Sequence, residues 1–240
     1  ATDTYSQKVI DAFASVAANA DEYTESVRNA AFILSSDSSA KEALRGFSFS
    51  FIKGSGAYAG RARMQGSKVQ VTMDLAAWNG RSLIENTIHE AFHGLLLSGL
   101  SKDNNLVPKK VREARIKLSG IKRKVKEAAS NEKDSKPYLT EPLESNSLSV
   151  FASNMMSNTE FQNGVRGLLP SIEDGATIRE VSNIMLEIVA PESTKDEDFK
   201  LAFFETLNAQ NYGKSEPITP AGQRQEAADA VGYEIDSLNA

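Results

Sequence analysis

The chain has 240 residues, which suits one domain, or one domain with an appended part, and is ample for a sizeable core. Apolar residues make up 40% of it and charged residues 25%, as in ordinary globular proteins, and no apolar run approaches the length of a membrane-spanning helix. The absence of cysteine excludes disulfides and thiolate metal sites, so any metal must have nitrogen and oxygen ligands. We expect a soluble protein without a transmembrane segment, which is intracellular or virion-associated, or which has lost a targeting segment before residue 1. Cysteine usage does not fix the location, because a fold without disulfides works in either redox compartment.

The first part of the chain predicts helices followed by a small β-sheet. Apolar residues at helical spacing predict two helices between residues 4 and 35. From Phe47 to Phe51 phenylalanine alternates with serine, which is typical of a half-buried strand. Residues 57–64 and 68–75 predict two further strands joined by a turn at Gly66. We expect an antiparallel hairpin directly before the next helix.

That next helix is predicted from a capping pattern and an apolar stripe. Ser82 and Glu85 have the spacing of a capping box, in which each side chain binds the other residue's backbone N–H. Gly99 is expected to end the helix. The apolar residues at helical spacing are Leu83, Ile84, Ile88, Phe92, Leu95 and Leu96.

In the middle of this helix, His89, Glu90 and His93 form the pattern His-Glu-x-x-His and use the only two histidines of the chain. Positions i and i+4 lie on one helix face, so both imidazoles can bind one metal ion. The glutamate can then reach a water on that metal. The pattern is typical of zinc-dependent peptidases. The alternative is a pair of core histidines, which must explain two histidines one turn apart and none elsewhere.

The next segment, from Lys109 to Lys126, is strongly basic. It has nine cationic side chains and one acidic one, a net charge of +8, in a chain whose overall charge is −5. Its apolar residues recur at steps of three and four, which predicts a helix that packs on the core and exposes a basic face to solvent. This face is a candidate contact for an acidic partner. No aromatic residues interleave the cations, so we do not expect a nucleic-acid partner.

The rest of the chain predicts helices. We expect them at about residues 140–157, 159–168, 177–189 and 195–208, followed by a C-terminal tail. The predicted domain organisation has an N-terminal helical segment, a central domain that contains the histidines, and the tail. The boundaries of these three parts are 1–46, 47–212 and 213–240.

Catalytic zinc takes three protein ligands and a water, so a carboxylate must join the two histidines. Glu144 is the leading candidate, because a helix that begins near Thr140 aligns it with the apolar residues at +4, +7 and +11. A carboxylate on that stripe needs a partner, which a metal would supply. The alternative is a first-turn glutamate that complements the helix dipole. Further candidates for the third ligand are Glu141, Glu205 and Asp74.

A β-hairpin, a His-Glu-x-x-His helix and a later helix with glutamate together resemble the Glu-zincin metallopeptidases, over about residues 57–156. Tyr138 followed by Glu144, Leu148 and Phe151 is similar to the pattern of the anthrax-lethal-factor-like and Pro-Pro endopeptidase group. It is also similar to zincin modules in phage and mobile-element polyproteins. The resemblance implies an α+β fold, mostly helical, with a small antiparallel sheet before the motif helix.

The expected function is a zinc-dependent endopeptidase acting on peptides or proteins. His89, His93 and Glu144 would bind Zn²⁺, Glu90 would act as general base, and Tyr138 would donate to the oxyanion.

The expected substrate platform is the strand at 68–75, because an exposed strand edge can accept a peptide as an added strand. Two alternatives remain. One is a zincin fold without catalysis, kept as a structural or interaction module, for example in a phage. The other is a metal-dependent hydrolase that acts on something other than peptides and uses the same residues.

Overall fold

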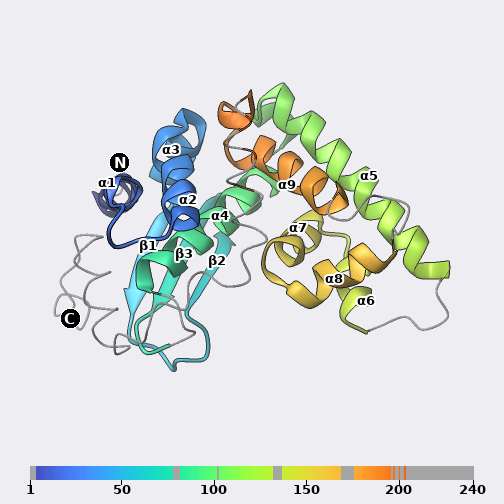
Figure 1. Cartoon of the computed structure of the whole chain (residues 1–240), viewed down its shortest axis with the longest axis horizontal. Helices are drawn as coiled ribbons and strands as arrows, with labels where there is room; N and C mark the ends of the chain where they lie inside the picture. Colours follow the sequence, from blue (N-terminus) through green and yellow to red (C-terminus); the bar gives the residue numbers. More distant parts are fainter. Residues whose placement is uncertain are drawn as a thin grey trace. The chain divides into compact units, whose positions relative to one another are not determined.

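The structure is a computed structural model, and the chain is mostly helical with one small β-sheet (Figure 1). The expected α+β fold class is therefore confirmed. The described residues up to Ser98 form one compact unit, unit 1, and those from Gly99 onward form a second, unit 2. The described residues are 4–77, 82–101, 103–131, 137–168, 176–195, 197, 200 and 203.

Unit 1 begins with three helices, α1 (Thr4–Ala18), α2 (Glu25–Ser36) and α3 (Ser38–Arg45). The two expected helices are confirmed as α1 and α2, which pack on each other. The third was not predicted. It begins where Asp37 ends α2, because the Asp37 carboxylate accepts the backbone N–H of Ala40 at 2.9 Å and so caps a new helix.

The sheet has three strands, β1 (Ser48–Ile52), β2 (Gly60–Gln65) and β3 (Lys68–Asp74). The expected hairpin is confirmed: β2 and β3 are antiparallel, and Gly66 in the turn has φ 61°, a conformation that favours glycine. The sheet as a whole is mixed rather than antiparallel, because β1 pairs with β3 in parallel and the strand order is β1-β3-β2. Strand β3 is thus central.

A short loop between β1 and β2 makes this order possible by crossing the end of β3. The carboxylate of Asp74, the last residue of β3, accepts the backbone N–H groups of Gly54, Gly56 and Ala76 at 2.9, 2.8 and 2.9 Å. Gly56 has φ 76°, and a Cβ on Gly54 would lie 2.6 Å from Asp74 Oδ2. Both glycines are therefore required for the loop to close around this carboxylate.

Helix α4 (Leu83–Ser101) covers one face of the sheet (Figure 1). The predicted capping box is present: Ser82 N–H donates to Glu85 Oε2 at 2.6 Å, and Glu85 N–H donates to Ser82 Oγ at 3.2 Å. All six residues of the predicted apolar stripe are buried. The predicted stop at Gly99 is wrong. A Cβ there would lie 2.4 Å from Ile188 Cγ2, so this glycine serves close packing within unit 2 and not helix termination.

Unit 2 is helical. Its longer helices are α5 (Lys109–Asn131), α6 (Pro137–Glu144), α7 (Leu148–Ser157), α8 (Thr159–Leu168) and α9 (Ala176–Val189), with 3₁₀ turns at Asn104–Leu106 and Ser193–Lys195. The predicted basic helix is confirmed as α5, and it packs along α9 (Figure 1). Its buried residues are Val111, Ala114, Leu118, Ile121 and Val125.

The prediction of a single helix over 140–157 is wrong, because the helical conformation is interrupted between α6 and α7. Ser147 N–H donates to Ser145 Oγ at 3.1 Å, and Lys122 Nζ donates to the Ser145 carbonyl oxygen. These side-chain bonds replace the helical hydrogen bonds of the intervening turn. Glu144 is consequently the last residue of α6 rather than the first-turn residue of the helix that buries Phe151.

Most of the predicted helix at 195–208 and the whole predicted tail at 213–240 lie outside the described residues. The domain boundaries near residues 46 and 212 stay predictions. Within the described part of the chain, none of the helices is long and apolar enough to cross a membrane.

Gly94 sets how closely α4 approaches the sheet, and we predict that alanine there lowers the free energy of unfolding. A Cβ at Gly94 would lie 2.6 Å from Phe47 Cε2 and 2.9 Å from Val69 Cγ1, both on buried side chains. Overpacking of this kind costs about 1–3 kcal/mol, which exceeds the roughly 1 kcal/mol that alanine gains in helix propensity. We expect a net loss of up to about 2 kcal/mol in urea unfolding.

Gly120→Ala is the matched control. Gly120 also lies inside a helix, and apart from its chain neighbours and the nearby backbone of that helix, no described atom comes within 4 Å of the position its Cβ would take. We expect this variant to gain about 0.5–1 kcal/mol. Equal effects of the two substitutions would contradict the close contact at Gly94.

Candidate metal centre

The two histidines of α4 face each other. Their Nε2 atoms are 3.0 Å apart, and the ring centroids are 4.6 Å apart with the planes at 69°. Zinc binds imidazole nitrogens at about 2.0–2.1 Å, so a tetrahedral ion would hold two of them about 3.3 Å apart. A separation of 3.0 Å requires the rings to open by only a few tenths of an ångström. Two neutral imidazoles at this distance also form a hydrogen bond, whose donor depends on the tautomer.

The histidines occupy the least buried face of α4. Most of the helix is buried, including Ile88, Ala91 and Phe92, whereas His89, Glu90 and His93 are half-buried. Core histidines would lie on the buried face of α4 with Ile88 and Phe92. The histidine side chains are instead partly exposed, although the ring of His93 is enclosed enough to lose hydration.

The environment of His93 keeps its imidazole neutral. Burial lowers the pKa of His93 to about 4, because the protonated ring loses hydration there. Metal binding requires an unprotonated ring nitrogen. At neutral pH the ring of His93 is therefore uncharged, and metal binding does not have to compete with an imidazolium.

Strand β2 begins beside Glu90. A Cβ built on Gly60, the first residue of β2, would lie 2.7 Å from Glu90 Cγ and 2.8 Å from Met73 Cε. The backbone of β2 thus passes directly against the glutamate of the motif, and a side chain at position 60 would require Glu90 or Met73 to shift. Sequence reasoning missed the role of Gly60. The available signal was a glycine at the first position of a predicted strand that is followed by the motif helix.

The proposed third ligand lies in unit 2. Glu144 is 59% exposed, and its Oε2 accepts from Lys126 Nζ at 2.9 Å. The expectation that this carboxylate lies on a buried stripe and lacks a partner is therefore wrong, and its partner in unit 2 is a lysine. The ligand role itself stays a prediction. Among the described residues, no three His, Asp or Glu side chains form a group that could hold a metal ion.

Asp74 is the one further candidate ligand whose side chain the structure describes. The oxygens of Asp74 already accept three backbone N–H groups, which makes this residue the anchor of the crossing loop rather than a free ligand. Tyr138 and Glu141 belong to α6, but their side chains lie outside the described part of the structure. Glu205 also lies outside it.

Several cations of α5 are engaged within unit 2, which corrects the picture of a wholly solvated basic face. Lys110 Nζ donates to the Pro191 carbonyl oxygen at 2.7 Å, beyond the end of α9, and Arg115 Nε donates to the Gly99 carbonyl oxygen at 2.7 Å. Lys122 Nζ donates to the Ser145 carbonyl oxygen, beyond the end of α6. The Gly99 carbonyl lies in the last turn of α4, where helical carbonyls lack an internal donor, and the other two carbonyls follow the ends of α9 and α6.

Comparison of the chain with family models, with curated proteins and with solved structures finds no match. The candidate metal centre therefore rests on the residues of α4 and on their geometry. The likeness to Glu-zincins stays an expectation carried by the motif and the hairpin before it.

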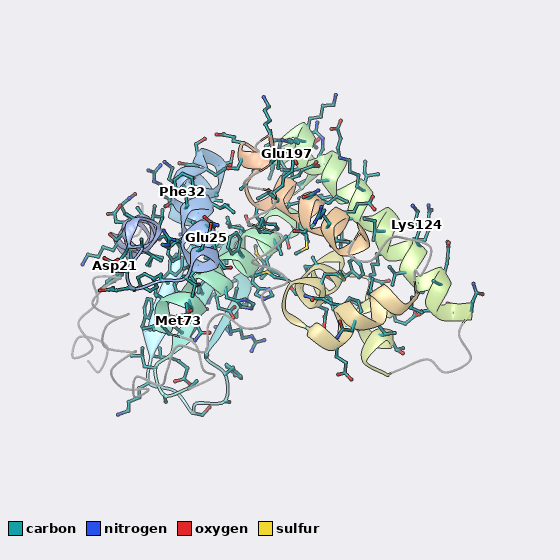
Figure 2. All side chains as sticks on the ribbon, in the orientation of Figure 1. Asp21, Glu25, Phe32, Met73, Lys124 and Glu197 are labelled. Atoms are coloured by element: carbon teal, nitrogen blue, oxygen red, sulfur yellow. The ribbon has the colours of Figure 1, made fainter. Side chains whose placement is uncertain are left out.

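Lys122 and Lys124 provide a matched test of this structural role. Burial lowers the pKa of Lys122, and nearby Lys126 lowers it further, as expected for an amine held against the break between α6 and α7. Lys124 is exposed on the outer side of α5 and has no hydrogen bond or ion pair with any described residue (Figure 2). We expect Lys122→Ala to cost about 1–2 kcal/mol of unfolding free energy, and Lys124→Ala to change it by less than about 0.5 kcal/mol. Indistinguishable urea midpoints for the two variants would refute the structural role of Lys122.

Proposed function

We propose that the protein is a zinc-dependent metallopeptidase whose metal is held by His89 and His93. The observation that carries the proposal is the pair of Nε2 atoms 3.0 Å apart on the half-exposed face of α4. The donor set fits the ion, since zinc accepts imidazole nitrogens and carboxylate oxygens and the chain has no thiolate. Bound zinc would supply a water that deprotonates near neutral pH and a positive charge for the scissile carbonyl oxygen.

Glu90 is the proposed general base. It follows His89 directly, so it projects from α4 on the side where the backbone of β2 passes. Its carboxylate would take a proton from the attacking water and pass it to the leaving amine. Glu144 is the proposed third ligand and Tyr138 the proposed oxyanion donor, both on the strength of the motif resemblance.

The substrate platform must be revised. The expected strand at 68–75 is wrong for this role, because β3 pairs with β1 on one side and β2 on the other and has no open edge. Among the described residues β2 is an edge strand, and it is the strand that touches Glu90. We therefore assign the substrate to β2, where an extended peptide can pair with the exposed backbone.

The second candidate function is a non-catalytic interaction module, for example in a phage, and one surface of unit 2 favours it. A groove of about 810 Å³ runs along α5, and Ile116 within it is 72% exposed. An exposed apolar residue between cations suits an acidic partner with an apolar side chain. The cations of the groove are Lys109, Arg112, Arg115 and Arg123, and its one acidic residue is Glu113, which pairs with Lys109 at 3.6 Å.

Glu90→Gln separates the two candidates. The amide keeps the shape of the side chain but cannot accept a proton at neutral pH, so we expect loss of hydrolysis by at least about a hundredfold with zinc still bound. Hydrolysis is measured by mass spectrometry on a peptide library, and zinc by elemental analysis of the same sample. Turnover at the wild-type rate in a zinc-loaded variant would remove Glu90 from the mechanism. Zinc-loaded wild-type protein that cleaves no peptide would favour the interaction module.

The third ligand can be assigned by chelator competition. We expect Glu144→Ala to weaken zinc binding by at least about tenfold and Glu141→Ala to have a small effect, because only the former removes the proposed ligand. Lys126→Ala is the control, since it breaks the same exposed ion pair but keeps the carboxylate. Equal losses from Glu144→Ala and Lys126→Ala would indicate a structural effect. A larger loss from Glu141→Ala would transfer the ligand role to that residue.

A further inference from the structure

The two faces of β2 differ sharply in chemistry. Gly60, Ala62 and Met64 are half-buried and face α4, while Arg61 and Arg63 are exposed on the opposite, outer face of the sheet. Side chains alternate between the two faces along a strand, so the residues of β1 and β3 that pair with Arg61 and Arg63, or lie an even number of positions from those partners, are also on this outer face. These neighbours are Ser48, Ser50, Ile52, Lys68, Gln70, Thr72 and Asp74. The outer face thus carries three cations. Its one carboxylate among the described strand residues is that of Asp74 at the end of β3, whose oxygens accept three backbone N–H groups.

The two arginines keep their positive charge uncompensated within the described part of unit 1. Arg63 donates from Nε and Nη2 to Gln70 Oε1 at 3.0 and 2.8 Å, and this partner is a neutral amide. Arg61 lies opposite Thr72 and forms neither a hydrogen bond nor an ion pair with a described residue. Arg63 likewise has no acidic partner there. The Gln70 bond holds the Arg63 guanidinium over the sheet, next to the open edge.

The backbone of β2 can accept a further strand at that edge. Asp74 N–H donates to the Ala59 carbonyl oxygen at 3.0 Å, so the residues that bond to β3 are 59 and every second residue after it. The backbone N–H and C=O groups of Gly60, Ala62 and Met64 therefore point away from β3. An extended peptide can pair with these three residues.

The register of such a peptide follows from the position of Glu90. Its residue opposite Gly60 would lie beside the motif glutamate, because Gly60 touches Glu90. The next residue and the one two positions later would stand opposite Arg61 and Arg63, on the outer face. Directly opposed residues of neighbouring strands have Cβ atoms about 4.5–5.5 Å apart, so their side chains interact.

From this register we propose that the substrate is an acidic peptide with Asp or Glu at two alternate positions on one side of the scissile bond, recognised by Arg61 and Arg63. The proposal rests on the proposed peptidase function for its register. Arginine is suited to this task because its fork of N–H donors matches a carboxylate. The positive outer face would also attract acidic segments over other sequences.

The experiment has a binding arm and a cleavage arm. The probe is a fluorescein-labelled extended peptide made in three versions, with Glu, Gln or Lys at the two alternate positions. Binding is measured by fluorescence anisotropy with the metal chelated, so it does not depend on hydrolysis. Cleavage of the same peptides is measured by mass spectrometry with zinc present. The proteins are wild type, Arg61→Glu/Arg63→Glu, Arg61→Gln/Arg63→Gln, and Lys124→Glu as a control for net charge.

Wild type should bind the Glu peptide about fivefold to twentyfold more tightly than the Gln peptide, since each exposed pair contributes about twofold to fivefold. This preference should decrease with added salt and be absent in Arg61→Gln/Arg63→Gln. In Arg61→Glu/Arg63→Glu the Lys peptide should bind more tightly than the Glu peptide. Lys124→Glu should retain it. Equal binding of the three peptides to wild type overturns the proposal, even if all three are cleaved. Acid-selective binding that depends on the arginines supports it, and absence of cleavage in that case counts against the peptidase function alone.

Discussion

The close approach of α4 to the sheet at Gly94 is the constraint on which the candidate site depends. Gly94 follows His93 directly, and the absence of a side chain lets Phe47 and Val69 pack against the helix backbone. This contact fixes both the height of α4 over the sheet and the side it turns outward. The outward side carries His89, Glu90 and His93. A helix held further away could keep the motif but would not place Glu90 against the backbone of β2.

The second constraint is the carboxylate of Asp74. It binds the loop that carries the chain across the end of β3, and this loop delivers β2 to the far edge of the sheet. Without that crossing, β2 would not be the strand beside Glu90. A buried side chain with no direct part in the proposed chemistry therefore determines which strand edge borders the site. Gly54 and Gly56 allow this loop to close on Asp74 and Ala76, whereas Gly60 lies against Glu90 and Met73.

The motif helix could be predicted from sequence because its determinants are local. The capping pair Ser82 and Glu85, the apolar stripe and the histidine spacing all lie within a few turns of one helix. The parallel pairing of β1 with β3 could not be predicted from sequence, because apolar residues alternate in the same way in parallel and antiparallel strands. The break after Glu144 was missed because it depends on bonds from Ser145 Oγ and from Lys122, a residue on another helix. The partner of Glu144 was missed for the same reason.

The central claim is that the two imidazoles of α4 bind zinc. X-ray absorption and elemental analysis of the zinc-loaded protein test it together, because they report how much metal is bound and by which atoms. The account predicts about one zinc per chain with imidazole nitrogens at about 2.0–2.1 Å, and loss of that zinc in the His89→Ala/His93→Ala double variant. Far less than one zinc per chain, or the same zinc retained without the two histidines, would contradict it.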